Sequence, residues 1–167
     1  VISEVMYYPL AGTPQNGCEW IELYNRSADA VSLDGWAVLL GSATGYPDFL
    51  TATLEPGHAA VVTGCDQFQQ QCPSCQIIAL ADGKIGKVGL PNTGDNIRLL
   101  PQPGSSDFQI DAMSYGTDTS VCQHPAVATP GQSLQLESLD AAQCAYVAGT
   151  PSPGEPPPPP PPTPTET

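Results

Sequence analysis

The run from Glu19 to Asn25 has a period of two and constrains the fold more than any other feature of the chain. The run reads EWIELYN, so Ile21 and Leu23 point to one face of the backbone and the residues between them point to the other. A period of two is typical of a β-strand that lays one face against a hydrophobic core. The pair Asp34-Gly35 then favours a turn into an apolar run. The segment therefore predicts two neighbouring strands, at 19–25 and 35–41.

The rest of the chain consists of short β-like segments separated by turn-forming pairs such as Pro56-Gly57 and Pro130-Gly131. Many short strands at regular spacing are typical of a sandwich or a barrel, so we predict an all-β domain. One or two helical turns are expected at 66–71. Strands are expected at 1–8, 19–25, 35–41, 49–54, 58–64, 76–80, 95–100, 108–115 and 133–138.

Three blocks of sequence carry a family resemblance. They are the entry strand Ile2–Pro9, the strand pair Glu19–Trp36, and the run LPNTGDNIRLL at 90–100 followed by IDAMSY at 110–115. In their order and spacing, over roughly residues 1–140, these blocks resemble the lamin tail domain family. The resemblance implies an immunoglobulin-like β-sandwich, which occurs in nuclear lamins and also as a module of secreted and surface bacterial proteins.

The charge balance is strongly acidic, with 4 Lys and Arg against 17 Asp and Glu and a formal net charge of −13. Binding to a phosphate backbone needs a basic patch, whereas Arg26, Lys84, Lys87 and Arg98 are scattered along the chain. The resemblance to lamins therefore brings no expectation of nucleic-acid binding. A strongly negative surface instead fits an extracellular or cell-surface protein whose copies repel one another. The sequence contains no run of 18 apolar residues, so no membrane span is predicted. We expect a signal peptide to have been removed before Val1.

An even number of cysteines indicates disulfides formed in an oxidising compartment. Sequence-local bridges are expected: Cys122 with Cys144, Cys65 with Cys72 or Cys75, and Cys18 with the remaining one. The alternative for Cys72-Pro73-Ser74-Cys75 is a metal or redox site. A zinc site usually takes four ligands from two close pairs, and a thioredoxin-like role needs the motif at the start of a helix. Neither context is present, so we predict three structural disulfides among Cys18, Cys65, Cys72, Cys75, Cys122 and Cys144.

The composition changes after residue 148, where proline and threonine become dominant. A run of prolines settles into a polyproline II helix of about 3.1 Å per residue, so Pro151–Thr167 could span about 50 Å. We therefore expect a β-sandwich domain over 1–148 and an extended tail over 149–167. Threonines beside prolines also suit O-glycosylation, as in stalks. The candidates are Thr163, Thr165 and Thr167.

Polyproline segments bind aromatic-lined grooves because their conformation is already fixed. Tyr7, Tyr46 and Tyr146 are candidate exposed aromatic residues for such a contact. A tail that docks on the next copy makes a head-to-tail contact, and such contacts build a filament when they do not close. The residues predicted to dock are Pro156, Pro157, Pro158, Pro159, Pro160, Pro161 and Pro162.

Residues of catalytic type do not fall into any catalytic pattern. His58 and His124 have no nucleophile motif nearby. Glu19 and Glu22 are three residues apart on a strand and so point to opposite faces, unlike a glycosidase pair. We expect these two carboxylates to serve as exposed charge and as acceptors for backbone hydrogen bonds, and we predict that the protein is not an enzyme.

No cofactor is predicted, with a calcium ion as the alternative. Carboxylates can hold calcium, but the aspartates of the right region lack EF-hand spacing. Asn25-Arg26-Ser27 is a glycosylation sequon, although we expect the side chain of Asn25 to cap a turn. The candidate calcium ligands are Asp95, Asp107, Asp111 and Asp118.

These features together predict a non-catalytic, secreted structural module that is a subunit of a cell-surface or extracellular assembly, such as a filament. The expected partner is a second copy of the chain, with carbohydrate or cell wall left open. The alternative is an anchoring or interaction module of a larger secreted enzyme or adhesin, with the tail as the interdomain linker.

Overall fold

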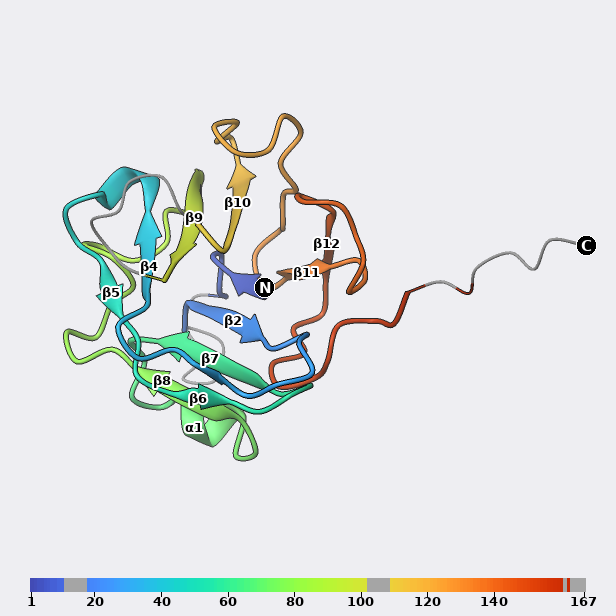
Figure 1. Cartoon of the computed structure of the whole chain (residues 1–167). Coiled ribbons are helices and arrows are strands. Elements are labelled where there is room, and N and C mark those ends of the chain that lie inside the picture. Colours follow the sequence, from blue (N-terminus) through green and yellow to red (C-terminus); the bar gives the residue numbers. More distant parts are fainter. Residues whose placement is uncertain (11–17, 102–108, 161, 163–167) are drawn as a thin grey trace, which may run out of the picture.

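The computed structural model describes residues 1–10, 18–101, 109–160 and 162, and these residues form two packed β-sheets (Figure 1). Within them, the larger sheet has the strand order β12-β11-β1-β2-β7-β8 and the smaller has the order β10-β9-β4-β5, beside a two-stranded ribbon of β3 and β6. The elements are β1 Ile2–Met6, β2 Trp20–Tyr24, β3 Val31–Ser32, β4 Ala37–Leu40, η1 Gly41–Ala43, β5 Asp48–Phe49, β6 Thr53–Leu54, β7 Ala59–Thr63, α1 Phe68–Gln71, β8 Gln76–Ala79, β9 Gly94–Leu100, β10 Asp111–Gly116, β11 Ser133–Leu136 and β12 Tyr146–Gly149.

The main core lies between the two sheets because each sheet contributes one apolar face. Ile21 and Leu23 of β2 belong to the same buried cluster as Ile97 and Leu99 of β9. None of these four side chains is more than 2% exposed. The period of two at residues 19–25 therefore identified the inward face of β2 correctly.

The opposite face of the larger sheet carries a second, smaller apolar cluster. Trp20 of β2 lies edge-on to Phe68 of α1, with 5.8 Å between the ring centroids. Met6 and Val61, on the strands that flank β2, belong to the same cluster. This part of the outer sheet face is therefore covered by α1 and its flanking loops.

Most of the expected strands are present with shorter bounds, and the helical turn expected at 66–71 is α1. The segment expected as one strand at 49–54 instead forms β5 and β6, which belong to different sheets. Strands β3 and β12 were not expected. Strand β3 has only two residues, and β12 reads YVAG, which shows no alternation of apolar and polar side chains.

The exposed aromatic residues are only partly those expected. Tyr46 is 50% exposed, as predicted, but Tyr7 and Tyr146 are buried. Tyr7 stacks on Tyr115 with 4.2 Å between the ring centroids, so its ring is a core element. Phe49 is 62% exposed because it lies on β5, at the edge of the smaller sheet.

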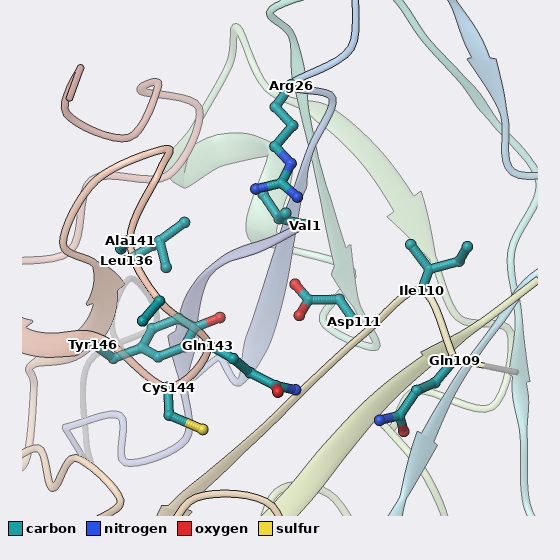
Figure 2. Close-up of a pocket in the computed structure, with 11 residues that line it drawn as sticks. Val1, Arg26, Gln109, Ile110, Asp111, Leu136, Ala141, Gln143, Cys144 and Tyr146 are labelled. Atoms are coloured by element: carbon teal, nitrogen blue, oxygen red, sulfur yellow. The ribbon is translucent and has the colours of Figure 1, made fainter. Parts of the chain in front are cut away.

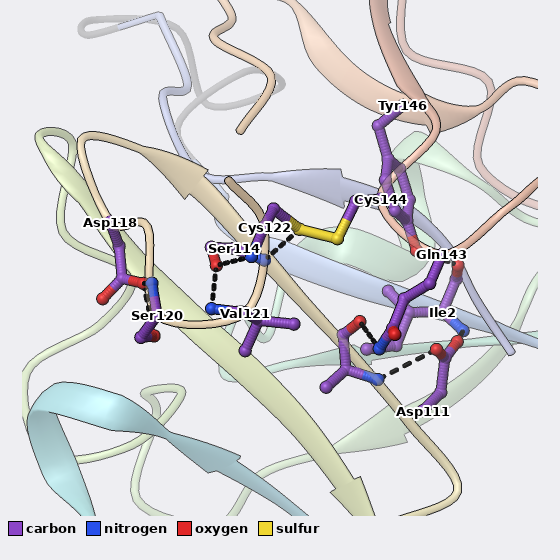
Figure 3. Close-up of a disulfide and its surroundings, with 11 residues drawn as sticks. Ile2, Asp111, Ser114, Asp118, Ser120, Val121, Cys122, Gln143, Cys144 and Tyr146 are labelled. Carbon is purple, nitrogen blue, oxygen red and sulfur yellow. Dashed lines mark hydrogen bonds between the residues drawn. A yellow bond between two sulfur atoms is a disulfide. The ribbon is translucent and has the colours of Figure 1, made fainter. Parts of the chain in front are cut away.

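Three disulfides join all six cysteines. The expected bridge between Cys122 and Cys144 is present and ties the loop after β10 to the approach to β12 (Figure 3). The expected partner of Cys65 was wrong, because Cys65 pairs with Cys18 and Cys72 pairs with Cys75. Strands β2 and β7 are antiparallel neighbours. Cys18, just before β2, and Cys65, just after β7, therefore lie at the same end of this strand pair. This pairing also leaves the C-x-x-C sulfurs bonded to each other rather than to a metal.

Among the described residues, none of the helices has the length and apolar character needed to cross a bilayer.

Candidate functional site: an acidic groove beneath the C-terminal segment

A groove of about 260 Å³ lies on the outer face of the larger sheet, over β1, β2 and β11. Its other wall is the chain that follows β12, and we call residues 150–158 the C-terminal strap. In Figure 1 this segment bends back beside the sheet before the tail leaves the domain. The groove is lined by Ser3, Glu4, Glu22, Gln135, Leu136, Thr150, Ser152, Glu155, Pro156, Pro157 and Pro158.

Glu4 holds the start of the strap. A register shift in the ladder between β1 and β2, from Ile2 to Glu4, brings this carboxylate to the groove. Glu4 is 2% exposed, and Ser152 reaches both of its oxygens: the backbone N donates to Oε1 at 2.9 Å, and Oγ donates to Oε2 at 3.0 Å. Two residues of β11 also donate to Oε1, Ser133 through Oγ and Gln135 through Nε2. Four donors from the strap and the sheet thus converge on one buried carboxylate.

Glu22 holds the next turn of the strap. Its Oε2 accepts the backbone N–H of Gly154 at 2.6 Å, and its Oε1 accepts the hydroxyl of Ser3 at 2.6 Å. Burial raises the pKa of Glu22 to about 7, and the nearby charges of Glu4 and Glu155 act in the same direction, against the two hydrogen bonds. The expectation of an exposed charge was wrong for Glu22, which is 1% exposed because the strap covers it.

Glu19 has the role that the sequence predicted. It is half-buried, and its Oε2 accepts the backbone N–H of Leu90 at 2.7 Å. Burial raises the pKa of Glu19. This carboxylate therefore fixes the loop before β9 and takes no part in the groove.

The middle of the strap lies against the C-x-x-C disulfide. Gly154 has φ +86°, and a Cβ built on it would lie 2.9 Å from Sγ of Cys75, so glycine is the residue that fits. Sγ of Cys72 lies 3.5 Å from the carbonyl oxygen of Pro153. The backbone N of Leu139 then donates to the carbonyl of Pro158 at 3.2 Å. The strap is thus fixed along its whole length.

Of the tail beyond the strap, Pro159, Pro160 and Pro162 are described and are exposed. Pro161 and the candidate glycosylation sites Thr163, Thr165 and Thr167 lie outside the described residues. The expectations placed on these four residues therefore stay predictions.

A second pocket, of about 350 Å³, lies where the ends of β1, β2 and β10 meet the loop before β12 (Figure 2). Its polar groups are used to join these segments. Asp111 accepts the backbone N of Ile2 at 2.7 Å, Oη of Tyr146 donates to the carbonyl of Ile2 at 2.7 Å, and Nε2 of Gln143 donates to the carbonyl of Ala112 at 3.1 Å (Figure 3). The arrangement is that of a structural joint, with no nucleophile next to a base among the lining residues.

The candidate histidines and aspartates do not converge. His58 is exposed at the start of β7, with Nδ1 3.1 Å from the carbonyl oxygen of Pro56, and His124 is exposed in the loop after Cys122. Among the described residues no three His, Cys, Asp or Glu side chains gather in a way that could hold a metal ion. Of the candidate calcium ligands, Asp107 lies outside the described residues. The other three accept hydrogen bonds from nearby residues: Asp95 from Ser42, Asp111 from Ile2, and Asp118 from Ser120.

Asn25 caps a turn, as the sequence predicted. It is 5% exposed, and its Nδ2 donates to the carbonyls of Asp29 at 2.9 Å and Leu54 at 2.8 Å. Its Oδ1 accepts the backbone N of Ser27 at 3.0 Å. The side-chain amide of Asn25 is therefore buried and hydrogen-bonded within the fold.

Replacing Asn25 by Ala is expected to lower the free energy of unfolding by about 2 kcal/mol, because it removes the four hydrogen bonds of this buried side chain. Urea denaturation of the variant measures the change. Asn92→Ala, at an exposed position, is the control and is expected to change little. Equal stability of the two variants would contradict the capping role.

The comparison with known proteins agrees with the architecture. The family model of the Lamin Tail Domain matches residues 1–117, which include every strand from β1 to β10. No curated protein and no solved structure matches the chain significantly. The lamin tail domain is a non-catalytic, immunoglobulin-like domain, and the two strand-rich sheets described above have that character. The three disulfides fit an extracellular setting. The chain therefore belongs to the lamin tail domain family.

Proposed function

We propose that the chain is a non-catalytic anchoring module of a larger secreted or cell-surface protein, and that the proline tail spaces the sandwich from the next part of that protein. One observation carries the proposal. The C-terminal strap is bonded to Glu4 and Glu22 on β1 and β2, and the exposed residues Pro159 and Pro160 follow it directly. The tail therefore starts from a fixed point on the sandwich.

The attachment point suits a tether. Strand β12 is at the edge of the larger sheet, whereas β1 and β2 lie inside it, with neighbours on both sides. A pull on the tail reaches Gly154 and Ser152 before it reaches β12, so the load falls on interior strands. An edge strand without this strap could be peeled away one residue at a time.

A second candidate is self-assembly, in which the proline tail docks on a neighbouring copy. Tyr46 and Phe49, at 50% and 62% exposure, favour it, since exposed aromatic residues are what polyproline segments bind. The Nζ of Lys87 lies 5.0 Å from the centroid of the Tyr46 ring. Strand β5 and the end of the C-terminal strap, drawn in red, lie on opposite sides of the view in Figure 1, which suits a head-to-tail contact between copies.

The two functions predict different behaviour of the complete chain. We expect sedimentation velocity to show monomers over a wide range of concentration, both for residues 1–167 and for a chain that ends at Pro158. Small-angle scattering of a fusion with a compact domain after Thr167 is expected to show the two bodies held apart, by about 28 Å of polyproline for the nine residues after the strap.

Assembly of the complete chain that is lost when it ends at Pro158 would overturn the anchoring function and support self-assembly. In that case Phe49→Ser should weaken assembly as strongly as the truncation does. A fusion whose two bodies collapse onto each other would contradict the spacer.

A further inference from the structure

The two carboxylates beneath the C-terminal strap differ in how well their surroundings replace water. A carboxylate has about four positions that accept hydrogen bonds. Within the described part of the chain, Glu4 receives four donors, whereas Glu22 receives two, the hydroxyl of Ser3 and the backbone N–H of Gly154. A buried charge with few donors is costly. Glu22 is therefore the weak point of the attachment when it is ionised.

Among the residues that the structure describes, no opposite charge compensates Glu22. Glu4 faces it from β1 and Glu155 from the strap, and both raise its pKa. On the side of β7, the adjoining pocket includes Tyr24 of β2 and exposed His58, together with Gly154 of the strap. Neither pocket has a Lys or Arg among its described lining residues. The disulfide between Cys72 and Cys75, which lies next to Gly154, does not titrate.

A protonated Glu22 would satisfy the same neighbours without a charge. Its Oε2 can still accept the N–H of Gly154, while a proton on Oε1 can be donated to Oγ of Ser3. That hydroxyl has a second acceptor within reach, because the backbone carbonyl of Glu22 lies 3.3 Å from Oγ of Ser3. The groove thus accommodates the neutral side chain with every donor paired.

We propose that the C-terminal strap is a proton-controlled latch, which is held on the sheet when Glu22 is protonated and loosens when Glu22 is ionised. The latch depends only on residues of the sandwich and the strap, so it holds whatever the tail carries. Loosening would release residues 150–158 and lengthen the tether by roughly 28 Å at the rise of an extended polyproline chain.

The direction of the effect follows from linkage. Lifting the strap lets water reach Glu22, and its pKa falls from about 7 toward the ordinary value of 4.5. The closed strap therefore binds the proton more tightly than the open one, so protonation favours closure. The preference for closure is complete below pH 4.5, is lost as the pH rises through 7, and is constant above that. In this range the opening equilibrium increases by up to about tenfold for each pH unit.

Amide hydrogen exchange measured by NMR tests the latch on the complete chain. The probes are the amides of Ser152 and Gly154, with each rate divided by the intrinsic rate at that pH. We expect their protection to fall by up to about 100-fold between pH 5 and pH 7 and then to level off. Glu22→Gln mimics the protonated side chain and is expected to keep the protection of pH 5 at every pH up to 8.5.

Two controls separate the latch from a change in overall stability. Glu137→Gln, at an exposed position next to β11, should retain the wild-type pH profile. The amide of Leu23, in the interior strand β2, should stay protected throughout. Strap protection that does not vary with pH, a Glu22→Gln profile that follows the wild type, or a parallel loss at Leu23 would each overturn the proposal.

Discussion

Replacing both Cys18 and Cys65 by Ala is expected to lower the free energy of unfolding by about 4 kcal/mol. The bridge closes a loop with a sequence separation of 47, so it removes a large part of the freedom of the unfolded chain. It also joins the start of β2 to the end of β7 beside the cluster of Trp20 and Phe68. Urea denaturation followed by the fluorescence of the two tryptophans measures the change.

The matched comparison is the removal of the Cys72–Cys75 bridge, which has a sequence separation of only 3. On the same entropic basis this second loss is expected to be about 2 kcal/mol. Equal effects of the two double substitutions, or a larger effect at Cys72 and Cys75, would show that chain entropy is not the main contribution of the long bridge. The slope of the urea dependence is expected to rise more when the long bridge is removed, because the unfolded chain can then expand and expose more surface.

Replacing Glu4 by Ala is expected to cost about 3 kcal/mol, because four hydrogen bonds to one buried carboxylate are lost together. The donors of Ser133 and Gln135 stay within the sheet, while Ser152 can regain water only if the strap lifts. The variant is therefore expected to lose amide protection at Ser152 as well as stability. Thermal or urea unfolding and hydrogen exchange on the same sample measure the two effects.

Two further variants make the Glu4 result specific. Glu137→Ala removes a carboxylate from an exposed position beside β11 and is expected to change stability by less than about 0.5 kcal/mol. Glu4→Gln keeps one acceptor oxygen and should recover part of the loss. If Glu4→Ala were as stable as Glu137→Ala, the strap would not be held in the way the hydrogen bonds indicate.

The sequence predicted the sandwich but not what covers its outer face. The alternation at Ile21 and Leu23 is a local property, and it placed β2 in the core. The pairing of Cys18 with Cys65 depends on β2 and β7 being neighbours, which is a property of the topology. Pairing Cys65 with a cysteine of the C-x-x-C motif passed over the bridge within the motif itself, which has a sequence separation of only 3, and this is why two of the three bridges were assigned incorrectly.

The strap was missed for a different physical reason. Prolines cannot donate backbone hydrogen bonds. A proline-rich segment is therefore predicted to be a solvated tail rather than part of the packed domain. Ser152 and Gly154 stand between those prolines and do donate, to Glu4 and Glu22. A non-proline residue every second position after β12, together with two glutamates on outward positions of β1 and β2, is the signal in the sequence that could have located the groove.

Strand β1 lies between β2 and β11, so the first strand of the chain pairs with residues 133–136 as well as with its immediate successor. Glu4 faces Gln135 across this ladder. Contacts between residues so distant along the chain slow folding, since a long loop must close before they form. Strand β11, which is synthesised long after β1, thus completes the sheet around β1. Until it arrives, one side of β1 is an unpaired edge that other chains could join.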